Sequence, residues 1–364
     1  MVTARAMVLG DFNSPLVELE IAVPDLAAGE ALVRITASGV CGSDIHMHRG
    51  QDPRTPLPMI LGHESVGMVE ETSGQVLDFE GRPLSPGDAV AWDRGTYCGE
   101  CEACERGDEH ICPARRAYGI HYGGTEPPPL KGGYATHIVL NSGTRIVRLP
   151  SDADHAALVS ASCSGATGSH SVDAAELGPG MVALVMGAGP LGLWTAALAR
   201  ETGATVIVIG RRPNRLALAG ELGCEAVFDE KATETGARRD EIMRLTGGQG
   251  ADAVIDTTAS LDAAREGLAL TRRGGRYVNS GAAIPVGEFP LRLYEDLVLR
   301  DITIRGVWVS STADFIRALE VALEGRYPLD RLVTHRFALS EANAALETAS
   351  SDRSAIKVVL EPKG

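Results

Sequence analysis

The 364-residue sequence has no hydrophobic run long enough to cross a membrane, no long basic segment and few aromatic residues. Phe, Trp and Tyr make up 4% of the chain, so the composition indicates no particular kind of binding pocket. The formal net charge is −14, and an acidic chain without a basic patch is a poor partner for nucleic acid or an anionic membrane. Residues 1–11 lack the charged and then apolar layout of a signal peptide. We therefore expect a cytoplasmic protein that binds neither nucleic acid nor membranes.

Internal repeats at solenoid or propeller periods and low-complexity segments are also absent from the sequence. A length of 364 residues instead suits two domains, each with its own core. The seven cysteines, in a reducing compartment, favour metal binding or reactivity over disulfides.

A strand, a glycine-rich turn and a helix follow one another from residue 182. The apolar run at residues 182–186 predicts a buried strand, and Gly187, Gly189 and Gly192 form G-x-G-x-x-G around Pro190 and Leu191. Residues 193–201 predict the helix that the turn opens, and residues 205–209 predict a second strand. Such a turn lets the backbone approach a pyrophosphate at the helix N-terminus. In this context we favour a dinucleotide-binding site over an ordinary strand-to-helix turn.

The rest of the chain separates into two kinds of pattern. Apolar runs alternate with helical stretches and predict a doubly wound parallel sheet of about six strands, at residues 182–186, 205–209, 226–228, 253–256, 276–280 and 302–307. The first 40 residues predict short strands with turns between them, and the tail is expected to return to that β-rich part. The predicted domains are residues 1–160 with 308–364, and residues 161–307.

The end of the second predicted strand indicates the cofactor. NAD sites place an acidic side chain there, where it binds the ribose hydroxyls. This chain has Gly210, Arg211 and Arg212, with Arg215 following. Because guanidinium groups suit a 2′-phosphate dianion, we expect NADP in preference to NAD.

Four cysteines form a compact group at the spacing C-x2-C-x2-C-x7-C: Cys98, Cys101, Cys104 and Cys112. Four thiolates can close a tetrahedral shell around one structural zinc ion and leave no position open for chemistry. A proline also follows the last cysteine of the iron–sulfur motif in bacterial ferredoxins, as Pro113 does here. Those proteins, however, place the last cysteine nearer the third. The spacing therefore predicts a structural zinc lobe at about residues 95–115 rather than an iron–sulfur cluster.

A second group of candidate metal ligands is spread along the chain. Cys41, His63 and Glu64 have side chains that bind zinc, and Cys163 lies just ahead of the predicted dinucleotide-binding domain. Taken singly, a cysteine here is as well explained by burial in a core, and a histidine by a turn.

In the order C-G-S-D-x-H, G-H-E, four-cysteine lobe and G-x-G-x-x-G, the chain resembles the zinc-dependent medium-chain alcohol dehydrogenases over nearly its whole length. The resemblance implies a GroES-like catalytic domain, a Rossmann domain and an active site between them. It implies a catalytic zinc on Cys41, His63 and Cys163, with Glu64 exchanging on and off the metal. It further implies that Ser43 takes the substrate proton, that His46 passes it to solvent, and that Ser280 and Lys357 contact the cofactor.

The expected activity is reversible hydride transfer between a primary or secondary alcohol and NADP, with two zinc ions per chain. Polyol dehydrogenases of the family have Glu where this chain has Cys163, and a fainter likeness points to a phosphonate-related subgroup. A polyol, sugar or phosphonate-pathway alcohol dehydrogenase, possibly using NAD, is therefore the alternative. Rivals of other kinds are a non-catalytic NADPH-binding protein and a zinc-free quinone-reductase relative. The family likeness also favours a homodimer or homotetramer, and residues 114–130 depart from its shorter members.

Overall fold

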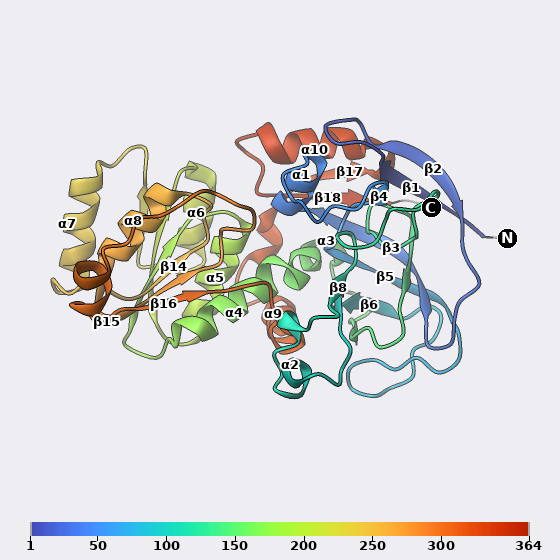
Figure 1. Cartoon of the computed structure of the whole chain (residues 1–364), viewed down its shortest axis with the longest axis horizontal. Coiled ribbons are helices and arrows are strands. Elements are labelled where there is room, and N and C mark those ends of the chain that lie inside the picture. The colour runs from blue at the N-terminus through green and yellow to red at the C-terminus, as the bar shows by residue number, and fades with distance from the viewer. Residues whose placement is uncertain (1, 363–364) are drawn as a thin grey trace. The chain divides into compact units, whose positions relative to one another are not determined.

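The computed structural model describes residues 2–362, and the chain divides into two compact units (Figure 1). One unit contains Met1–Cys163, Ser311–Leu323 and Asp330–Gly364. The other contains Ser164–Ser310 and Glu324–Leu329. Among the described residues, no helix combines the length and apolar character that crossing a bilayer requires.

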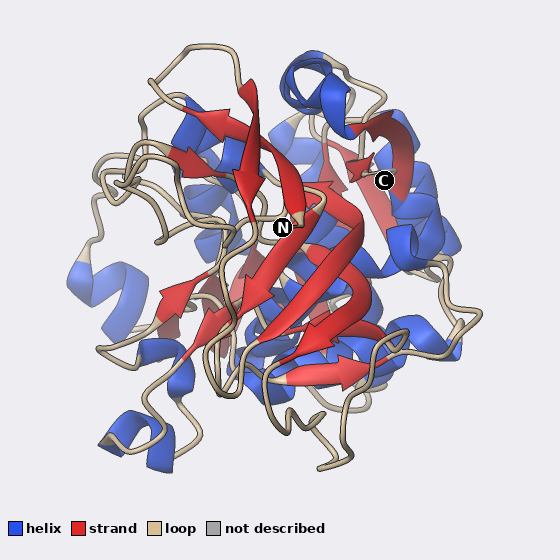
Figure 2. Cartoon of the chain, turned by 90° about the vertical axis from the view of Figure 1, so that its right-hand side faces the viewer, coloured by secondary structure: helices blue, strands red, loops and turns tan. Residues whose placement is uncertain are grey.

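The first unit is the β-rich part that the sequence predicts, and most of its strand pairs are antiparallel. A three-stranded sheet has the order β2-β1-β4, and a larger sheet of seven strands runs β10-β6-β5-β3-β18-β17 with β9 also on β3. Figure 2 faces this unit and shows its strands as a twisted sheet joined by long loops. The strands are β1 (Thr3–Leu9), β2 (Val17–Ala22), β3 (Ala31–Val40), β4 (Met59–Ile60), β5 (Ser65–Thr72), β6 (Ala89–Trp92), β9 (His137–Leu140), β10 (Ile146–Arg148), β17 (Val333–Ala338) and β18 (Lys357–Glu361).

The end of the chain completes this sheet, as the sequence predicts. β18 pairs antiparallel with β3, matching Val359 with Gly39, and parallel with β17. Short helices and one small ribbon connect the strands. They are α1 (Gly42–His48), α2 (Glu102–Glu105), η1 (Glu109–Ile111), α3 (His155–Leu158), η2 (Val159–Ser162), α9 (Thr312–Glu324), η4 (Leu329–Leu332), η5 (Leu339–Glu341), α10 (Ala342–Ser351) and the ribbon of β7 (Gly95–Thr96) with β8 (Arg116–Ala117). Apart from β8, residues 114–130 form no helix or strand, in agreement with their proline-rich sequence.

The second unit is the predicted doubly wound sheet. Its six strands are all parallel and lie in the order β13-β12-β11-β14-β15-β16. Strand β11 covers the predicted residues, whereas β14 and β15 begin before the predicted starts. The strands are β11 (Val182–Met186), β12 (Thr205–Gly210), β13 (Ala226–Asp229), β14 (Ala251–Asp256), β15 (Thr271–Asn279) and β16 (Thr303–Gly306).

Helices separate these strands in the chain and bury apolar side chains against the sheet. A core of side chains from β11, β12 and β14, with Ile242 and Leu268 from the helices, fills the space between the layers. The helices are α4 (Ser164–Ala175), α5 (Pro190–Glu201), α6 (Pro213–Glu221), α7 (Thr235–Leu245), α8 (Leu261–Leu270) and the π-helical turn η3 (Leu293–Val298).

Candidate functional site: two cysteine clusters and a nucleotide pocket

Strand pairing in the first unit brings three candidate ligands together. β3 and β5 pair antiparallel with Ser38 opposite Ser65, so the residues after β3 meet the residues before β5. The Gly39 N–H donates to the Glu64 carbonyl at 2.7 Å. A side chain at Gly39 would lie 2.5 Å from Glu64 Oε2, and this close approach explains the glycine. Cys41, which begins α1, therefore lies beside His63 and Glu64.

Cys163 completes this group, which we call the catalytic cluster after the role that the resemblance implies for it: Cys41, His63, Glu64 and Cys163. Cys163 follows η2 at the end of the first unit, and one ligand atom from each of the four residues lies within 4.8 Å of the others. His63, Glu64 and Cys163 are buried. The four residues that the sequence proposed as ligands are thus neighbours in space.

The catalytic cluster has the properties of a metal site. His63 Nε2 and Glu64 Oε1 are buried and have no hydrogen-bond partner among the described residues. Buried polar atoms are rarely left without a partner, because the loss of hydration is then uncompensated. Two thiols, an imidazole and a carboxylate are the donor set that zinc prefers, and a metal ion would satisfy both orphaned atoms. The residues therefore fit a zinc ion.

A buried carboxylate that the sequence analysis missed supports this cluster. Asp44 Oδ1 lies 3.3 Å from His63 Nδ1, and Asp44 Oδ2 accepts from the Cys41 backbone N–H at 2.8 Å. The Tyr134 hydroxyl also donates to Asp44 Oδ2, at 3.3 Å. A carboxylate at one imidazole nitrogen fixes the ring so that the other faces a metal. The sequence signal that could have identified this residue is the aspartate of the C-G-S-D motif, because a histidine that binds a metal commonly has a carboxylate beside its other ring nitrogen.

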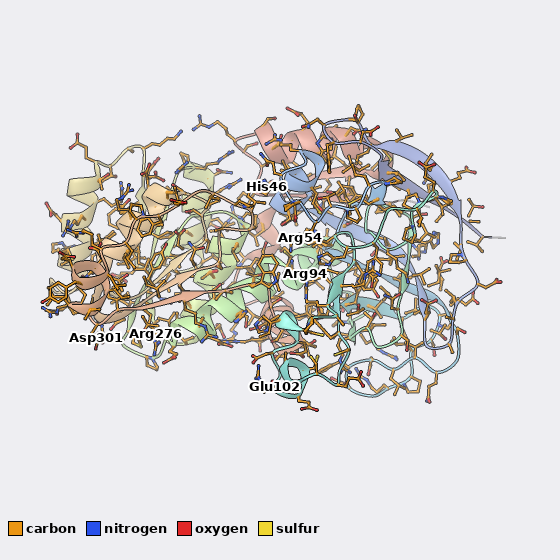
Figure 3. All side chains as sticks on the ribbon, viewed as in Figure 1. His46, Arg54, Arg94, Glu102, Arg276 and Asp301 are labelled. Carbon is orange, nitrogen blue, oxygen red and sulfur yellow. The ribbon has the colours of Figure 1, made fainter. Side chains whose placement is uncertain are left out.

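Two buried cations flank the catalytic cluster. The Lys357 ammonium donates to Glu64 Oε2 at 2.6 Å, and Arg94 Nη1 donates to Cys163 Sγ at 2.6 Å. Lys357 is 2% exposed and Arg94 4%. Figure 3 labels Arg94, which follows β6. The resemblance suggested that Lys357 contacts the cofactor; in the structure its ammonium contacts Glu64 within the first unit. No periodic pattern marks Arg94, and sequence reasoning did not find it.

These neighbours shift the pKa values inside the cluster. The hydrogen bond from Cys163 lowers the pKa of Cys41, against burial, which raises it. Burial by itself lowers the pKa of His63, but the charges of Asp44 and Cys41 outweigh it and raise the value to about 10. Burial raises the pKa of Glu64, and the charge of Lys357 opposes the rise. Cys41 is thereby favoured as a thiolate, the form that binds metals.

The two residues expected to carry the proton both lie on α1. Ser43 is in its first turn and His46 in its last. His46 Nδ1 lies 2.7 Å from Gln51 Oε1 (Figure 3 labels His46). Because an amide oxygen only accepts, Nδ1 is the donor in this contact, and Nε2 is the ring nitrogen that the contact leaves free of Gln51.

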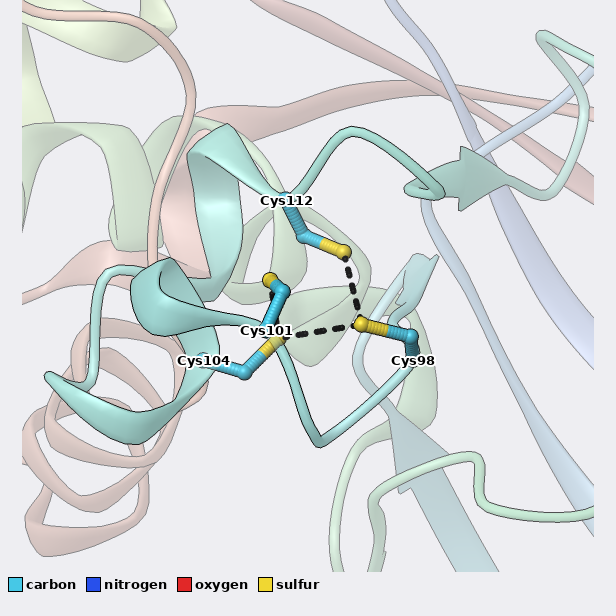
Figure 4. A group of neighbouring side chains, drawn as sticks. All are labelled: Cys98, Cys101, Cys104 and Cys112. Carbon is cyan, nitrogen blue, oxygen red and sulfur yellow. Dashed lines mark hydrogen bonds between the residues drawn. The ribbon is translucent and has the colours of Figure 1, made fainter.

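The four-cysteine lobe is the second cluster, and its sulfurs all lie within 4.8 Å of one another. Cys101 Sγ lies 3.5 Å from Cys104 Sγ, Cys112 Sγ lies 3.5 Å from Cys98 Sγ, and Cys98 Sγ lies 3.9 Å from Cys104 Sγ (Figure 4). Sulfurs about 2.3 Å from one tetrahedral ion are separated by about 3.8 Å. The lobe could therefore hold one ion, and its closed set of four thiols leaves no position for a substrate.

In the second unit, the glycine-rich turn borders a pocket of about 330 Å³. A side chain at Gly192 would meet the Gly187 carbonyl oxygen at 1.8 Å, so only glycine allows α5 to pack so closely on the turn. Among the predicted cofactor residues, the pocket is lined by Gly187, Gly189, Gly210, Arg211, Arg212 and Arg215. Pro190, Leu191 and Gly192 begin α5 instead, and Ser280 follows β15; none of these four lines the pocket.

Charged side chains make up part of the lining of this pocket. Burial and the charge of Arg212 lower the pKa of Arg215 to about 10, so Arg215 stays charged at neutral pH. Arg211 Nε lies 2.7 Å from Glu230 Oε2, and Glu230 also lines the pocket. The sequence analysis missed Glu230, because this residue follows β13, whereas the expected acidic residue follows β12.

Comparisons with known proteins agree with the resemblance in the sequence. An alcohol dehydrogenase GroES-like domain matches residues 27–151, and a zinc-binding dehydrogenase domain matches residues 190–324. The chain is 33% identical over 349 residues to 5-exo-hydroxycamphor dehydrogenase of Pseudomonas putida, which covers 94% of this chain and 95% of that protein.

Solved structures show the same likeness along the full length of the chain. An alcohol dehydrogenase of Thermotoga maritima superposes with a TM-score of 0.95 at 44% identity, covering 100% of both chains. A protein of Sinorhizobium meliloti described as a zinc-binding dehydrogenase, bound to NADP, superposes with a TM-score of 0.86 at 25% identity and the same 100% coverage of both chains. The chain belongs to the zinc-dependent medium-chain alcohol dehydrogenases.

Proposed function

We propose that the protein catalyses reversible hydride transfer between a primary or secondary alcohol and NADP, with one zinc ion in the catalytic cluster and one in the lobe. The observation that carries the proposal is the buried cluster of Cys41, His63, Glu64 and Cys163, whose ligand atoms lie within 4.8 Å of one another. A zinc ion held by these residues would supply a Lewis acid that lowers the pKa of an alcohol.

The surrounding residues hold this site in shape. Asp44 orients the His63 ring, and Arg94 holds the Cys163 sulfur by a hydrogen bond. Lys357 holds Glu64 by one carboxylate oxygen, so the other oxygen remains in the cluster. Glu64 would in this way be able to approach a zinc ion bound in the cluster or withdraw from it.

The proton of the alcohol leaves through α1 in this proposal. Ser43 would accept it at Oγ, and His46 would pass it on to water. The bond between His46 and Gln51 supports this role, because it leaves Nε2 of His46 as the atom that receives the proton. The cofactor supplies the hydride acceptor at its nicotinamide ring.

The pocket of the second unit is proposed to hold the adenosine end of NADP. Gly210 stands where an NAD site places its acidic side chain, and three arginines line the same pocket. Arg212 and Arg215 are close enough for one charge to lower the pKa of the other, and a 2′-phosphate would relieve that repulsion.

The test is steady-state kinetics on an alcohol and carbonyl panel, with NADP and NAD compared at each substrate. We expect a higher kcat/KM with NADP. The double substitution Arg211→Ala and Arg212→Ala should raise the KM for NADP about ten-fold or more and leave that for NAD nearly unchanged. A wild-type preference for NAD would refute the cofactor assignment. Binding of NADPH without turnover on any alcohol would favour the alternative that the protein is a non-catalytic NADPH-binding protein.

A further inference from the structure

The nucleotide pocket contains a carboxylate on the strand next to the one where NAD sites carry it. Strands β12 and β13 run parallel with Gly210 opposite Asp229, and the Glu230 backbone N–H donates to the Gly210 carbonyl at 2.8 Å. Glu230 thus stands beside the end of β12, the point at which an NAD site binds the ribose hydroxyls. Both Gly210 and Glu230 line the pocket.

The Glu230 side chain is joined to the arginine expected to bind the 2′-phosphate. Glu230 Oε2 accepts from Arg211 Nε at 2.7 Å, and the two side chains are 35% and 52% exposed. The second carboxylate in the pocket lining, Glu266, is held differently. It accepts from Nε and Nη2 of Arg238, each at 2.8 Å, and Arg238 is almost fully buried. Glu266 is therefore held by an arginine that does not line the pocket. Glu230 is paired instead with Arg211, which lines the pocket and is the arginine expected to bind the 2′-phosphate.

We propose that Glu230 is a specificity-determining residue that restrains the preference for NADP and lets the same pocket accept NAD. Its carboxylate accepts from a ribose hydroxyl when the 2′-phosphate is absent, and it repels the phosphate when that group is present. Arg211 acts in the opposite sense, so the pair sets the balance between the two cofactors. The inference rests on the proposed function in one respect only, namely that this pocket binds the adenosine end of a dinucleotide.

Binding of two fragments tests the inference without any need for turnover. Adenosine 2′,5′-bisphosphate carries the 2′-phosphate and AMP carries the hydroxyl, and calorimetry on the zinc-loaded protein gives a dissociation constant for each. Glu230→Gln keeps the shape of the side chain and removes its charge. Because the pair is partly exposed, we expect the bisphosphate to bind about five-fold more tightly and AMP to bind more weakly. Arg211→Ala should shift the ratio of the two constants the opposite way.

Glu241→Gln is the matched control. Glu241 is also paired with an arginine, Arg244, on the surface of the second unit, but it does not line the pocket. This substitution should leave both dissociation constants unchanged.

Several outcomes would overturn the inference. If Glu230→Gln leaves the ratio of the constants unchanged, Glu230 does not discriminate between the cofactors. If it weakens the bisphosphate, Glu230 serves to hold Arg211 for the phosphate, the reverse of the role inferred. If the wild type binds neither fragment, both this inference and the cofactor proposal fail. A wild type that prefers AMP while Glu230→Gln moves toward the bisphosphate would support the inference and refute only the NADP assignment.

Discussion

The two cysteine clusters of the first unit are built in opposite ways. The lobe takes all its ligands from residues 98–112, and its sulfurs range from exposed to buried. The catalytic cluster draws on the end of β3, the start of β5 and the residue after η2, and three of its four members are buried. The arrangement of the lobe cysteines depends on one short loop, whereas that of the catalytic cluster depends on the pairing of distant strands such as β3 and β5.

The difference extends to the charges around each cluster. Exposed acidic side chains surround the lobe, and Arg106 pairs with Glu102 and Asp108 at the surface. Around the catalytic cluster, Asp44, Arg94 and Lys357 are all buried and each contacts a ligand residue. Buried charges are retained only where they are paired, so a change in one of them disturbs its ligand. The catalytic cluster is therefore the more sensitive to its surroundings.

Removing one thiol from the catalytic cluster should have the largest effect. Cys163→Ala removes one of the two thiols of the catalytic cluster, so the zinc content should fall from the proposed two ions to one per chain. Loss of the Lewis acid should lower kcat/KM by about a thousand-fold or more. Metal analysis of the folded protein and steady-state kinetics measure both quantities. Retained activity would remove Cys163 from the ligand set.

Weakening the support of the same cluster should have an intermediate effect. Asp44→Asn keeps the shape of the side chain but removes the charge beside His63 Nδ1, 3.3 Å away. Loss of such a partner typically lowers metal affinity by about 10–100-fold. Competition with a chelator should therefore strip zinc from the catalytic cluster sooner than in the wild type, while the lobe ion stays.

Asp78→Asn is the control for that experiment. Asp78 is also a buried carboxylate of the first unit, but it binds Arg82 and not a ligand residue. If both substitutions release zinc equally, the effect of Asp44 is one of general stability and not of its contact with His63.

The contrast also explains how far the sequence could predict this protein. Cysteine spacing alone gave the lobe, since its geometry depends on a short loop. Apolar runs predicted the central strands β11, β12 and β14 of the parallel sheet, because strands buried on both faces are continuously hydrophobic. The members of the catalytic cluster were predicted from the order of motifs in a known family, because no spacing rule joins residue 41 to residue 163.

Two of the contacts that the sequence analysis did not predict join residues that are distant in the sequence. Arg94 and Cys163 are 69 residues apart, and Lys357 and Glu64 are 293 apart. Glu230 was missed because it lines the pocket from the end of β13, whereas the pattern places the acid after β12. A buried charge is stable only with its partner, and a sequence does not reveal that partner until the fold brings the two together.

Removing one thiol from the lobe should have the smallest effect on turnover, although the chemical change is as severe as in Cys163→Ala. Cys104→Ser should release the lobe ion and leave the catalytic one, because the two clusters share no ligand. The loss of order should be local, so hydrogen exchange should rise in residues 98–112 while kcat/KM of freshly prepared protein falls by less than about ten-fold. A loss of turnover as large as that of Cys163→Ala would show that the lobe shapes the active site and is not a separate structural element.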